Sequence, residues 1–582
     1  MNFLHSRLYG GFMTKVIIVY FFLACSLFFE SANAQLAYEG ENYEVSPFFL
    51  RDINNVEGLA DFQQIAHSFR ELYGPLEFKE RRFNFNFEDW VAEIEARIKI
   101  AKSEAEIFGL YYQFLAKFDD GHVGLSFINN SSEIKRYKVP VFLTPVEDRA
   151  LVAWVDKEMD TSIAVGDELI KVDGVPVFDY LPTIKKYYGI GNDLSLKHLI
   201  YKVLYREPFV TEWIPKKNRV FLTLKKEDGT EYTESLVWRP EKNNTIIPDM
   251  VTDYKGPNFY FHGAFEFNNA AGSSLLKMSQ AEPFFASSEV IEQYGLRRIS
   301  ANDEFRKKYK LKKSQKPNIY AYMYNYKGKN ILLVRNYTYW HRDLPNSAYM
   351  KAYQAIFDQY EPLADVLVLD QTHNGGGSYC EEFFTLFIQE EKPGTVQSCN
   401  VDRKWIQSLG GEWINKDNVK EIDRAYMSMS KDMESDYENN LSLTSYPFPI
   451  FSGEDYSKPN KKYTWKKPML VLTDELAGSC GDAFPKMIKT SKRSKIFGQR
   501  TMGLGGNVEE VAKLVYSQGS LRLTRGLFTT YKSDNNYPDS HMVENNGVVP
   551  DYEYNHTVTD FRKGFVDYVE KFSQKAVEQI VE

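Results

Sequence analysis

A serine at a predicted strand-to-helix corner has the setting that best suits covalent chemistry. Ser479 lies in LAGSCGDAF, after the apolar run MLVLT and before a helix-like segment that Asp482 could cap and in which Pro485 comes early. Such a corner exposes a hydroxyl at the carboxyl edge of an α/β sheet, where ligands bind. The free N–H groups at the helix start can stabilise an oxyanion. A serine that only caps the helix or fills a tight turn is the alternative.

Two glycine-rich segments favour the chemical interpretation. The buried-strand pattern VLVLD is followed by QTHNGGGS, in which residues 375–377 are all glycine, and GQRTMGLGGN follows the predicted helix. Consecutive glycines let the main chain approach a neighbour closely and adopt positive φ, which an anion pocket built from amides requires. Neither segment is specific alone, but together with Ser479 they predict a nucleophile beside an amide-lined pocket.

The bulk properties describe a large folded chain. With 582 residues, of which 43% are hydrophobic and 26% charged, several globular domains are expected. The net charge of -8 and the pI near 5.8 argue against nucleic acid as a partner, because phosphate-binding proteins normally carry a basic surface.

The N-terminus has the pattern of an export signal. Residues 1–34 contain the apolar run VIIVYFFLACSLFF and the small-residue site Ala32-Asn33-Ala34, so the mature chain is expected to begin at Gln35. The apolar run is short for a transmembrane helix, and no later segment is long enough, so no stable membrane insertion is expected after cleavage. We therefore predict a periplasmic or secreted protein. A lipoprotein is the less favoured outcome, because the residues around Cys25 match a lipoprotein signal poorly.

Changes in periodicity divide the rest of the chain. Residues 35–130 show helical spacing and are predicted to form an N-terminal helical cap. Residues 131–240 contain short β-like runs and the stretch SIAVGDELIKVDGVPVFDY, which resembles a PDZ domain. Residues 241–316 are polar and irregular and are interpreted as an insertion or linker. Residues 317–582 alternate strands with helices, which predicts an α/β catalytic domain with a parallel or mixed sheet.

The order of the motifs carries a family resemblance. DDGHV, the PDZ-like stretch, LVLDQTHNGGG, VLTDELAGSCGDAF, FGQRTMGLGG and ENNGVVPD together resemble the tail-specific, or C-terminal-processing, serine peptidases and their relatives, the tricorn core protease and the interphotoreceptor retinoid-binding proteins. The resemblance covers most of the mature chain. It implies a multidomain α/β protein with a helical cap, a PDZ-like β domain and a catalytic core of the ClpP/crotonase-like type. It also implies that Ser479 is the nucleophile and that the amides of Gly376 and Cys480 form the oxyanion hole.

The same resemblance indicates which residue activates the serine. The bacterial processing enzymes use a lysine at the position that Leu504 occupies here, so the lysine dyad is expected to be absent. The tricorn-like branch uses a histidine in a DGH motif, which His122 matches in FDDGHVGL, and a glutamate, which Glu544 matches. In that branch a serine beside the histidine connects the two, but Gly121 stands at this position.

Further departures leave alternatives open. His373 and His541 lie near matched motifs and are secondary candidates for the base. The family pattern Asp-x-Arg-x-Asn-x-Gly-Gly loses its arginine, because Thr372 stands at that position, whereas its glycine pair survives.

Three cysteines remain after the signal is removed, and none of them belongs to a paired metal-binding motif. An exported protein can form disulfides. Because Cys380 and Cys399 bracket one segment, we expect them to pair and Cys480 to be the odd thiol. No metal and no other cofactor are predicted.

These observations favour an exported serine endopeptidase. It would hydrolyse polypeptides or peptides through an acyl-enzyme at Ser479, with His122 as general base and Glu544 as a third member. The alternative is a catalytically inactive peptide- or ligand-binding protein on the same fold, which Thr372 and Gly121 motivate. An esterase of unrelated fold is disfavoured, because AGSCG lacks the Gly-x-Ser-x-Gly spacing.

Overall fold

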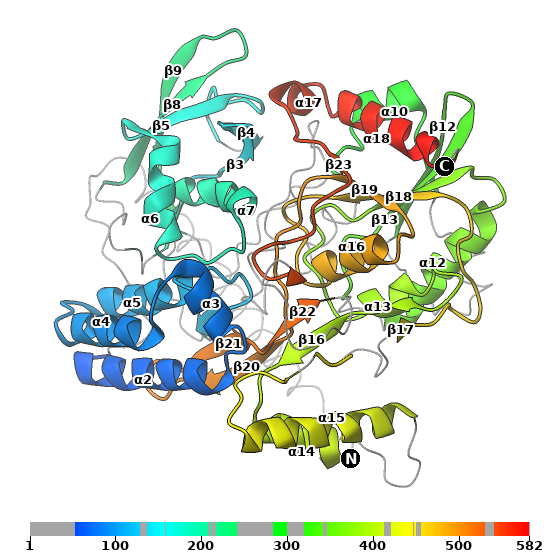
Figure 1. Cartoon of the computed structure of the whole chain (residues 1–582). Coiled ribbons are helices and arrows are strands. Elements are labelled where there is room, and N and C mark those ends of the chain that lie inside the picture. The colour runs from blue at the N-terminus through cyan, green and yellow to red at the C-terminus, as the bar shows by residue number, and fades with distance from the viewer. Residues whose placement is uncertain are drawn as a thin grey trace, which may run out of the picture.

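The structure is a computed structural model of the chain. The residues that it describes are 53–127, 137–156, 159–207, 210, 217–240, 283–299, 319–340, 346–412, 421–445, 447–449, 456–529 and 541–580. The predicted signal peptide and most of the expected insertion at 241–316 lie outside these ranges. The expected mixed α/β architecture is confirmed (Figure 1). Among the described residues, no helix has both the length and the apolar composition that crossing a membrane requires.

Four helices form the N-terminal unit. They are α2 (Asn55–Leu72), α3 (Leu76–Phe83), α4 (Phe87–Lys99) and α5 (Glu104–Ala116). Three of them begin where the sequence supplies a cap: the side chains of Asn54, Asn86 and Ser103 accept hydrogen bonds from N–H groups of the first turn. Aromatic rings fill the space between the helices, and those of Phe69 and Phe118 stack with centroids 4.5 Å apart.

A six-stranded antiparallel sheet forms the second unit. Its strands are β3 (Val141–Val146), β4 (Arg149–Val155), β5 (Glu168–Val172), β6 (Val175–Pro176), β8 (Arg219–Lys225) and β9 (Glu231–Val237), in the order β3-β4-β5-β8-β9 with β6 beside β5. Asp173 and Gly174 turn β5 into β6 with φ of 49° and 83°, as a tight hairpin requires. Short helices η1 (Val177–Tyr180), α6 (Leu181–Lys185), α7 (Asp193–Lys197) and η2 (His198–Leu204) lie between β6 and β8 in the chain.

A seven-stranded sheet forms the centre of the third unit. Its order is β11 (Arg297–Ile299), β12 (Tyr320–Tyr326), β13 (Lys329–Arg335), β14 (Val366–Asp370), β18 (Met469–Thr473), β19 (Lys495–Gly498) and β23 (Tyr552–Glu553). The strands from β13 to β23 are parallel, whereas β11 and β12 are antiparallel to their neighbours. β11 belongs to the stretch that we expected to be a linker, yet it pairs with β12.

Helices cover both faces of this sheet (Figure 1). One face packs against α10 (Ser288–Tyr294), α17 (Val558–Arg562) and α18 (Val566–Glu578). The other packs against α12 (Asn346–Tyr360), α13 (Cys380–Phe384) and α16 (Cys480–Thr490). Because β14 and β18 are covered on both sides, every residue in them is buried, which explains their continuous apolar runs.

Smaller elements connect the three units. β1 (Gly124–Phe127) pairs with β21 (Gly519–Thr524), which pairs with β20 (Val508–Lys513), so the end of the helical unit is joined to the C-terminal part of the chain. The remaining pairs are β2 (Tyr137–Lys138) between β7 (Tyr205–Arg206) and β10 (Arg239–Pro240), β15 (Lys392–Pro393) with β17 (Tyr456–Ser457), and β16 (Val396–Cys399) with β22 (Gly526–Thr529).

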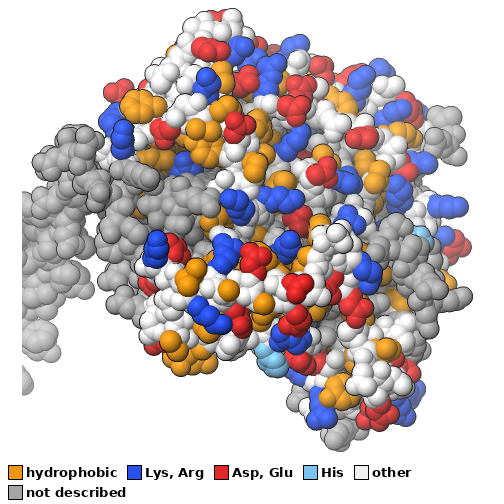
Figure 2. Space-filling model, turned by 60° about the vertical axis from the view of Figure 1, so that its left-hand side comes forward, with side chains coloured by type: hydrophobic (Ala, Val, Ile, Leu, Met, Phe, Trp, Pro, Cys, Tyr) orange, Lys and Arg blue, Asp and Glu red, His pale blue; other side chains and the backbone are white. Residues whose placement is uncertain are grey.

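A peripheral helical unit consists of α14 (Arg403–Gln407), the π-helical turn η4 (Ser408–Glu412) and α15 (Glu421–Glu438). It lies below β20 in the view of Figure 1. On the molecular face shown in Figure 2, basic and acidic side chains are interspersed.

Candidate active site

Ser479 stands at the corner between β18 and α16. It has φ 59° and ψ -121°, a main-chain conformation that residues other than glycine rarely adopt and that occurs preferentially at functional sites. Its carbonyl oxygen accepts hydrogen bonds from the N–H groups of Asp482 (2.8 Å) and Ala483 (2.9 Å), but its side chain makes no capping hydrogen bond to the helix. The Ser479 hydroxyl is therefore not used as a helix cap.

Asp482 does not cap α16 either, contrary to the expectation from the sequence. It is the third residue of the helix, and its two carboxylate oxygens accept hydrogen bonds from the N–H groups of Gly503 and Leu504, each at 2.9 Å. Burial raises the pKa of Asp482 to about 6. The start of α16 is thus tied to the glycine-rich segment that follows β19.

Pro485 lies within α16, where it cannot donate a hydrogen bond to the carbonyl oxygen of Gly481. The side-chain amide of Gln371 donates to that oxygen instead, at 3.3 Å. Because Gln371 directly follows β14, the hydrogen bond that the proline removes is replaced by one that ties α16 to the glycine loop after β14.

The glycine loop at 375–377 packs directly against the corner at Ser479. A Cβ atom on Gly376 would lie 2.6 Å from the Cβ of Ser479 and 2.9 Å from the nitrogen of Cys480, and Gly376 has φ of +96°. Only glycine fits both constraints, so the main chain of Gly376 lies in contact with Ser479 and with the N–H of Cys480. The Gly376 N–H donates to the side-chain oxygen of Asn374 at 2.9 Å.

His122 lies in the turn between α5 and β1. Its own N–H donates to Asp120 Oδ1 at 2.8 Å, and its carbonyl oxygen accepts from Arg522 Nε on β21, also at 2.8 Å. Burial lowers the pKa of His122 to about 4; the charges of Arg522 and Lys79 act in the same direction, and Asp120 opposes them. The imidazole is therefore neutral near pH 7, as a general base must be.

Leu504 lies between the histidine turn and the serine turn. A Cβ atom on Gly121 would lie 3.0 Å from one methyl group of Leu504, and a Cβ atom on Gly478 would lie 3.0 Å from the other. The residues that precede His122 and Ser479 therefore contact the same side chain. Leu504 stands at the position where the bacterial processing enzymes have a lysine. Its apolar side chain thus lies between the two turns and sets the distance between them.

Glu544 is fully buried and pairs with Lys79, a residue that the sequence analysis did not single out. Lys79, on α3, forms an ion pair with Glu544 Oε1 and donates to Asn545 Oδ1 at 2.6 Å, while the N–H of Gly505 donates to Glu544 Oε2 at 2.7 Å. Burial raises the pKa of Glu544 to about 7; the charge of Asp120 adds to the increase and Lys79 opposes it. Both oxygens of Glu544 are therefore engaged by groups other than His122.

Two family models match parts of this chain. Residues 330–554 match the model of peptidase family S41, and residues 136–249 match that of a PDZ domain. The chain is a serine peptidase similar to those of family S41. The resemblance, the PDZ-containing α/β fold and the assignment as a serine peptidase are thereby confirmed.

Relatives and solved structures match this serine peptidase over most of its length. It is 22% identical over 587 residues to a protein of Chlamydia pneumoniae, covering 90% of each chain, and 25% identical over 583 residues to an uncharacterized protein of Chlamydia muridarum, covering 90% of this chain and 92% of the relative. Mature CPAF complexed with lactacystin matches with a TM-score of 0.68 at 20% identity over 90% of this chain and 99% of CPAF. A serine-to-alanine variant of CPAF matches with a TM-score of 0.70 at 20% identity, over 91% and 98%. These two likenesses show the fold.

An arginine from a neighbouring strand bonds to Thr372, the position at which the family pattern has an arginine. Arg335 ends β13, in register with Asp370 on β14, and its Nη1 donates to Asp370 Oδ1 (3.0 Å) and to Thr372 Oγ1 (2.8 Å). Burial raises the pKa of Asp370, and the charge of Arg335 opposes this increase. The sequence contains a signal for this residue, because an arginine that ends the apolar strand ILLVR needs a buried anion nearby.

The two secondary histidine candidates lie in different surroundings. His373 forms an ion pair with Asp474, whose carboxylate oxygens also accept its N–H at 2.7 and 2.9 Å. This pair connects the loop after β14 to the loop after β18. His541 has an exposed side chain.

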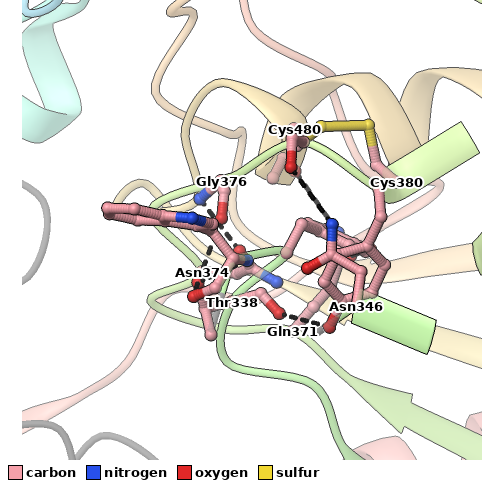
Figure 3. Close-up of a disulfide and its surroundings, with 12 residues drawn as sticks. Thr338, Asn346, Gln371, Asn374, Gly376, Cys380 and Cys480 are labelled. Atoms are coloured by element: carbon pink, nitrogen blue, oxygen red, sulfur yellow. Dashed lines mark hydrogen bonds between the residues drawn. A yellow bond between two sulfur atoms is a disulfide. The ribbon is translucent and has the colours of Figure 1, made fainter. Parts of the chain in front are cut away.

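The disulfide of this serine peptidase differs from the expected one. Cys380 is bonded to Cys480, and Cys399 is a free, buried thiol, so the expected pairing of Cys380 with Cys399 is wrong. The Cα atoms of the bonded pair lie 5.6 Å apart although 100 positions separate them in the sequence. Closeness in sequence was a poor guide, because α13 and α16 pack side by side on the same face of the sheet (Figure 3).

Proposed function

We propose that this serine peptidase is an exported endopeptidase that cleaves polypeptides or peptides through an acyl-enzyme at Ser479, with His122 as general base. The observation that carries the proposal is the close approach of Gly376 to Ser479, which leaves 2.6 Å between a Cβ at Gly376 and the Cβ of Ser479. A hydroxyl that does not cap its helix, beside two main-chain N–H groups, suits attack on a carbonyl group.

In the proposed reaction, Ser479 Oγ attacks the carbonyl carbon of the peptide bond while its proton passes to the His122 imidazole. The carbonyl oxygen becomes an oxyanion, which the N–H groups of Gly376 and Cys480 stabilise. The C–N bond then breaks, and the amine leaves with the proton that His122 returns. A water molecule, deprotonated by His122, finally hydrolyses the ester on Ser479.

In the free protein, the glycine loop that carries the proposed oxyanion donor Gly376 already makes a hydrogen bond with that donor. The Gly376 N–H already donates to Asn374 Oδ1. Under the proposed mechanism, the substrate oxygen has to replace this acceptor, so Asn374 keeps the loop ordered until substrate binds. Glu544 is proposed as the third member of the site, acting with Lys79 on the charge around His122 rather than through a direct hydrogen bond.

The test is mass spectrometry of an unfolded polypeptide incubated with the chain that begins at Gln35. We expect internal fragments from the parent and none from Ser479→Ala or His122→Ala. His541→Ala is the matched control, because it removes an exposed histidine. A peptide with an amidated C-terminus tests whether a free carboxylate is needed.

Products that persist in Ser479→Ala would exclude this mechanism. Binding of the polypeptide without products in any folded sample would support the alternative, an inactive binding protein. Internal fragments from both peptide forms would support endopeptidase action without a need for a free C-terminus, whereas loss of cleavage on amidation would indicate recognition of the C-terminal carboxylate.

A further inference from the structure

The disulfide joins the two elements that supply the oxyanion donors. Cys380 is the first residue of α13 and follows the loop that carries Gly376, whereas Cys480 is the first residue of α16 and is itself the second proposed donor. Figure 3 shows the bond between the two cysteines with Gly376 and Asn374 on the adjacent loop. A single covalent bond thus spans the loop after β14 and the corner after β18.

Close main-chain contacts fix the position of the loop after β14 relative to the corner after β18. The N–H of Gly478 donates to the carbonyl oxygen of Asn374 at 2.9 Å. A Cβ atom on Gly481 would lie 2.1 Å from that same oxygen. The contact leaves no space for a sliding motion, so any displacement of α13 or α16 changes the separation between the N–H groups of Gly376 and Cys480.

The bond lies in a close-packed apolar core. Cys380 and Cys480 have exposed fractions of 0% and 1%, and aromatic rings surround the ends of both helices, with those of Phe383 and Phe484 5.6 Å apart. Two separate thiols need a van der Waals distance between their sulfur atoms rather than a bond length. Because protein cores are close-packed, we expect reduction to displace at least one helix end.

We propose that Cys380 is a positioning residue: its disulfide to Cys480 holds the two oxyanion donors in place, and turnover depends on oxidation of this thiol pair. The inference rests on the proposed function. In the oxidation, the two thiols lose two electrons and two protons to a small-molecule disulfide such as oxidised glutathione, which becomes two glutathione thiols. Before this oxidation, when both thiols are reduced, the protein is a folded peptidase whose two oxyanion donors are displaced from their working positions.

The free cysteine does not take part in this chemistry. Burial raises the pKa of Cys399 to about 12, so its thiolate, which is the reactive form, is scarce near pH 7. Cys399→Ser therefore serves as a matched control that removes a thiol without touching the proposed pair.

The experiment compares the mature chain purified under reducing conditions with the same sample after oxidation by glutathione disulfide. Alkylation and mass spectrometry count the thiols in each. We expect oxidation to raise kcat by about 10²-fold, the effect of a displacement of about 1 Å at a reacting centre, with KM changed less than about twofold. Titration of active sites separates a slower enzyme from a smaller folded fraction.

The kcat of Cys399→Ser should rise on oxidation as that of the parent does. Cys380→Ser should keep the low kcat of the reduced parent whether or not the oxidant is added. If Cys380→Ser does not fold, the comparison of the two forms of the parent still decides. Equal kcat in the reduced and oxidised parent would overturn the inference while leaving the proposed function intact. Absence of cleavage by both forms would instead count against the proposed function itself.

Discussion

Lys79 and Glu544 form an ion pair in which neither side chain has any exposed surface. The pair joins α3, in the N-terminal helical unit, to the segment before β23, and 465 positions separate its members in the sequence. The Lys79 ammonium also donates to Asn545 Oδ1, and the Asn545 side chain donates to the carbonyl oxygen of Asp119 at 2.7 Å. The turn that carries His122 is therefore connected to Glu544 through Lys79, which also donates to the carbonyl oxygen of Asp119 at 3.5 Å, and through Asn545.

Replacing Lys79 by methionine should destabilise the protein, because it leaves the Glu544 carboxylate buried without its cation. A loss of about 3–5 kcal/mol is typical for breaking a buried pair in this way. The shift of the urea unfolding midpoint measures the effect. The double variant Lys79→Met/Glu544→Gln should lose less, because residue 544 then carries no charge and glutamine still offers an acceptor to Gly505. A double variant that is less stable than Lys79→Met would contradict this account.

The acid limit of activity should report the protonation of His122. A general base is lost when it is protonated, and the pKa of His122 is lowered to about 4 by burial, so kcat/KM should fall only as the pH drops through about 4. Arg522→Gln removes a cation that lowers this pKa, and the limit should then move to higher pH. A parent limit near pH 7 would instead identify Glu544, whose pKa burial raises to about 7, as the limiting group.

Gly376→Ala should abolish most turnover, because the added methyl group collides with Ser479 and with the carbonyl oxygen of Gly478, 2.8 Å away. A displacement of about 1 Å at this site is expected to cost about 10²-fold in kcat. Gly174→Ala is the matched control: Gly174 also has positive φ, but nothing lies within 4 Å of its added Cβ. Equal kcat for parent and Gly376→Ala on a peptide substrate would exclude the proposed oxyanion hole.

Arg335→Met should destabilise the catalytic sheet, because Asp370 is then buried without a cation, at a cost of about 3–5 kcal/mol. Thr372→Arg in the same background returns a guanidinium to the position that the family uses, and should recover part of the loss. Thermal unfolding measures both variants. Thr372→Val is the control, because it removes only the two hydrogen bonds of the Thr372 hydroxyl, each worth about 1 kcal/mol, and leaves the pair of Arg335 with Asp370 in place. Failure of Thr372→Arg to recover stability would show that the two arginine positions are not equivalent.

The sequence predicted those features that depend on local main-chain requirements. The corner at Ser479 and the glycine loop carry their signal in adjacent residues, because close approach and positive φ demand glycine at fixed places. The parallel sheet was predictable for the same reason, since strands buried on both faces read as continuous apolar runs. The roles of His122, Glu544, Gly376 and Cys480 stay predictions until the variants are measured.

The partners of buried charges and thiols could not be predicted in this way. Arg335 and Lys79 meet Asp370 and Glu544 only through the packing of separate elements, and no spacing along the chain encodes that contact. The disulfide was mispredicted for the same reason, because a cysteine pairs with whichever thiol the packed helices bring within reach.

The pairing of β1 with β21 has a consequence for the timing of activity. Arg522 on β21 holds the carbonyl oxygen of His122 across 400 positions of sequence. Chains are synthesised from the N-terminus, and domains fold in that order. A nascent chain that has just passed residue 479 already contains both the proposed nucleophile and the proposed base, but β21, the strand whose Arg522 bonds to the His122 turn, has yet to be made. If His122 is the base, we expect the peptidase to stay inactive during synthesis and to become active only when the fold is complete.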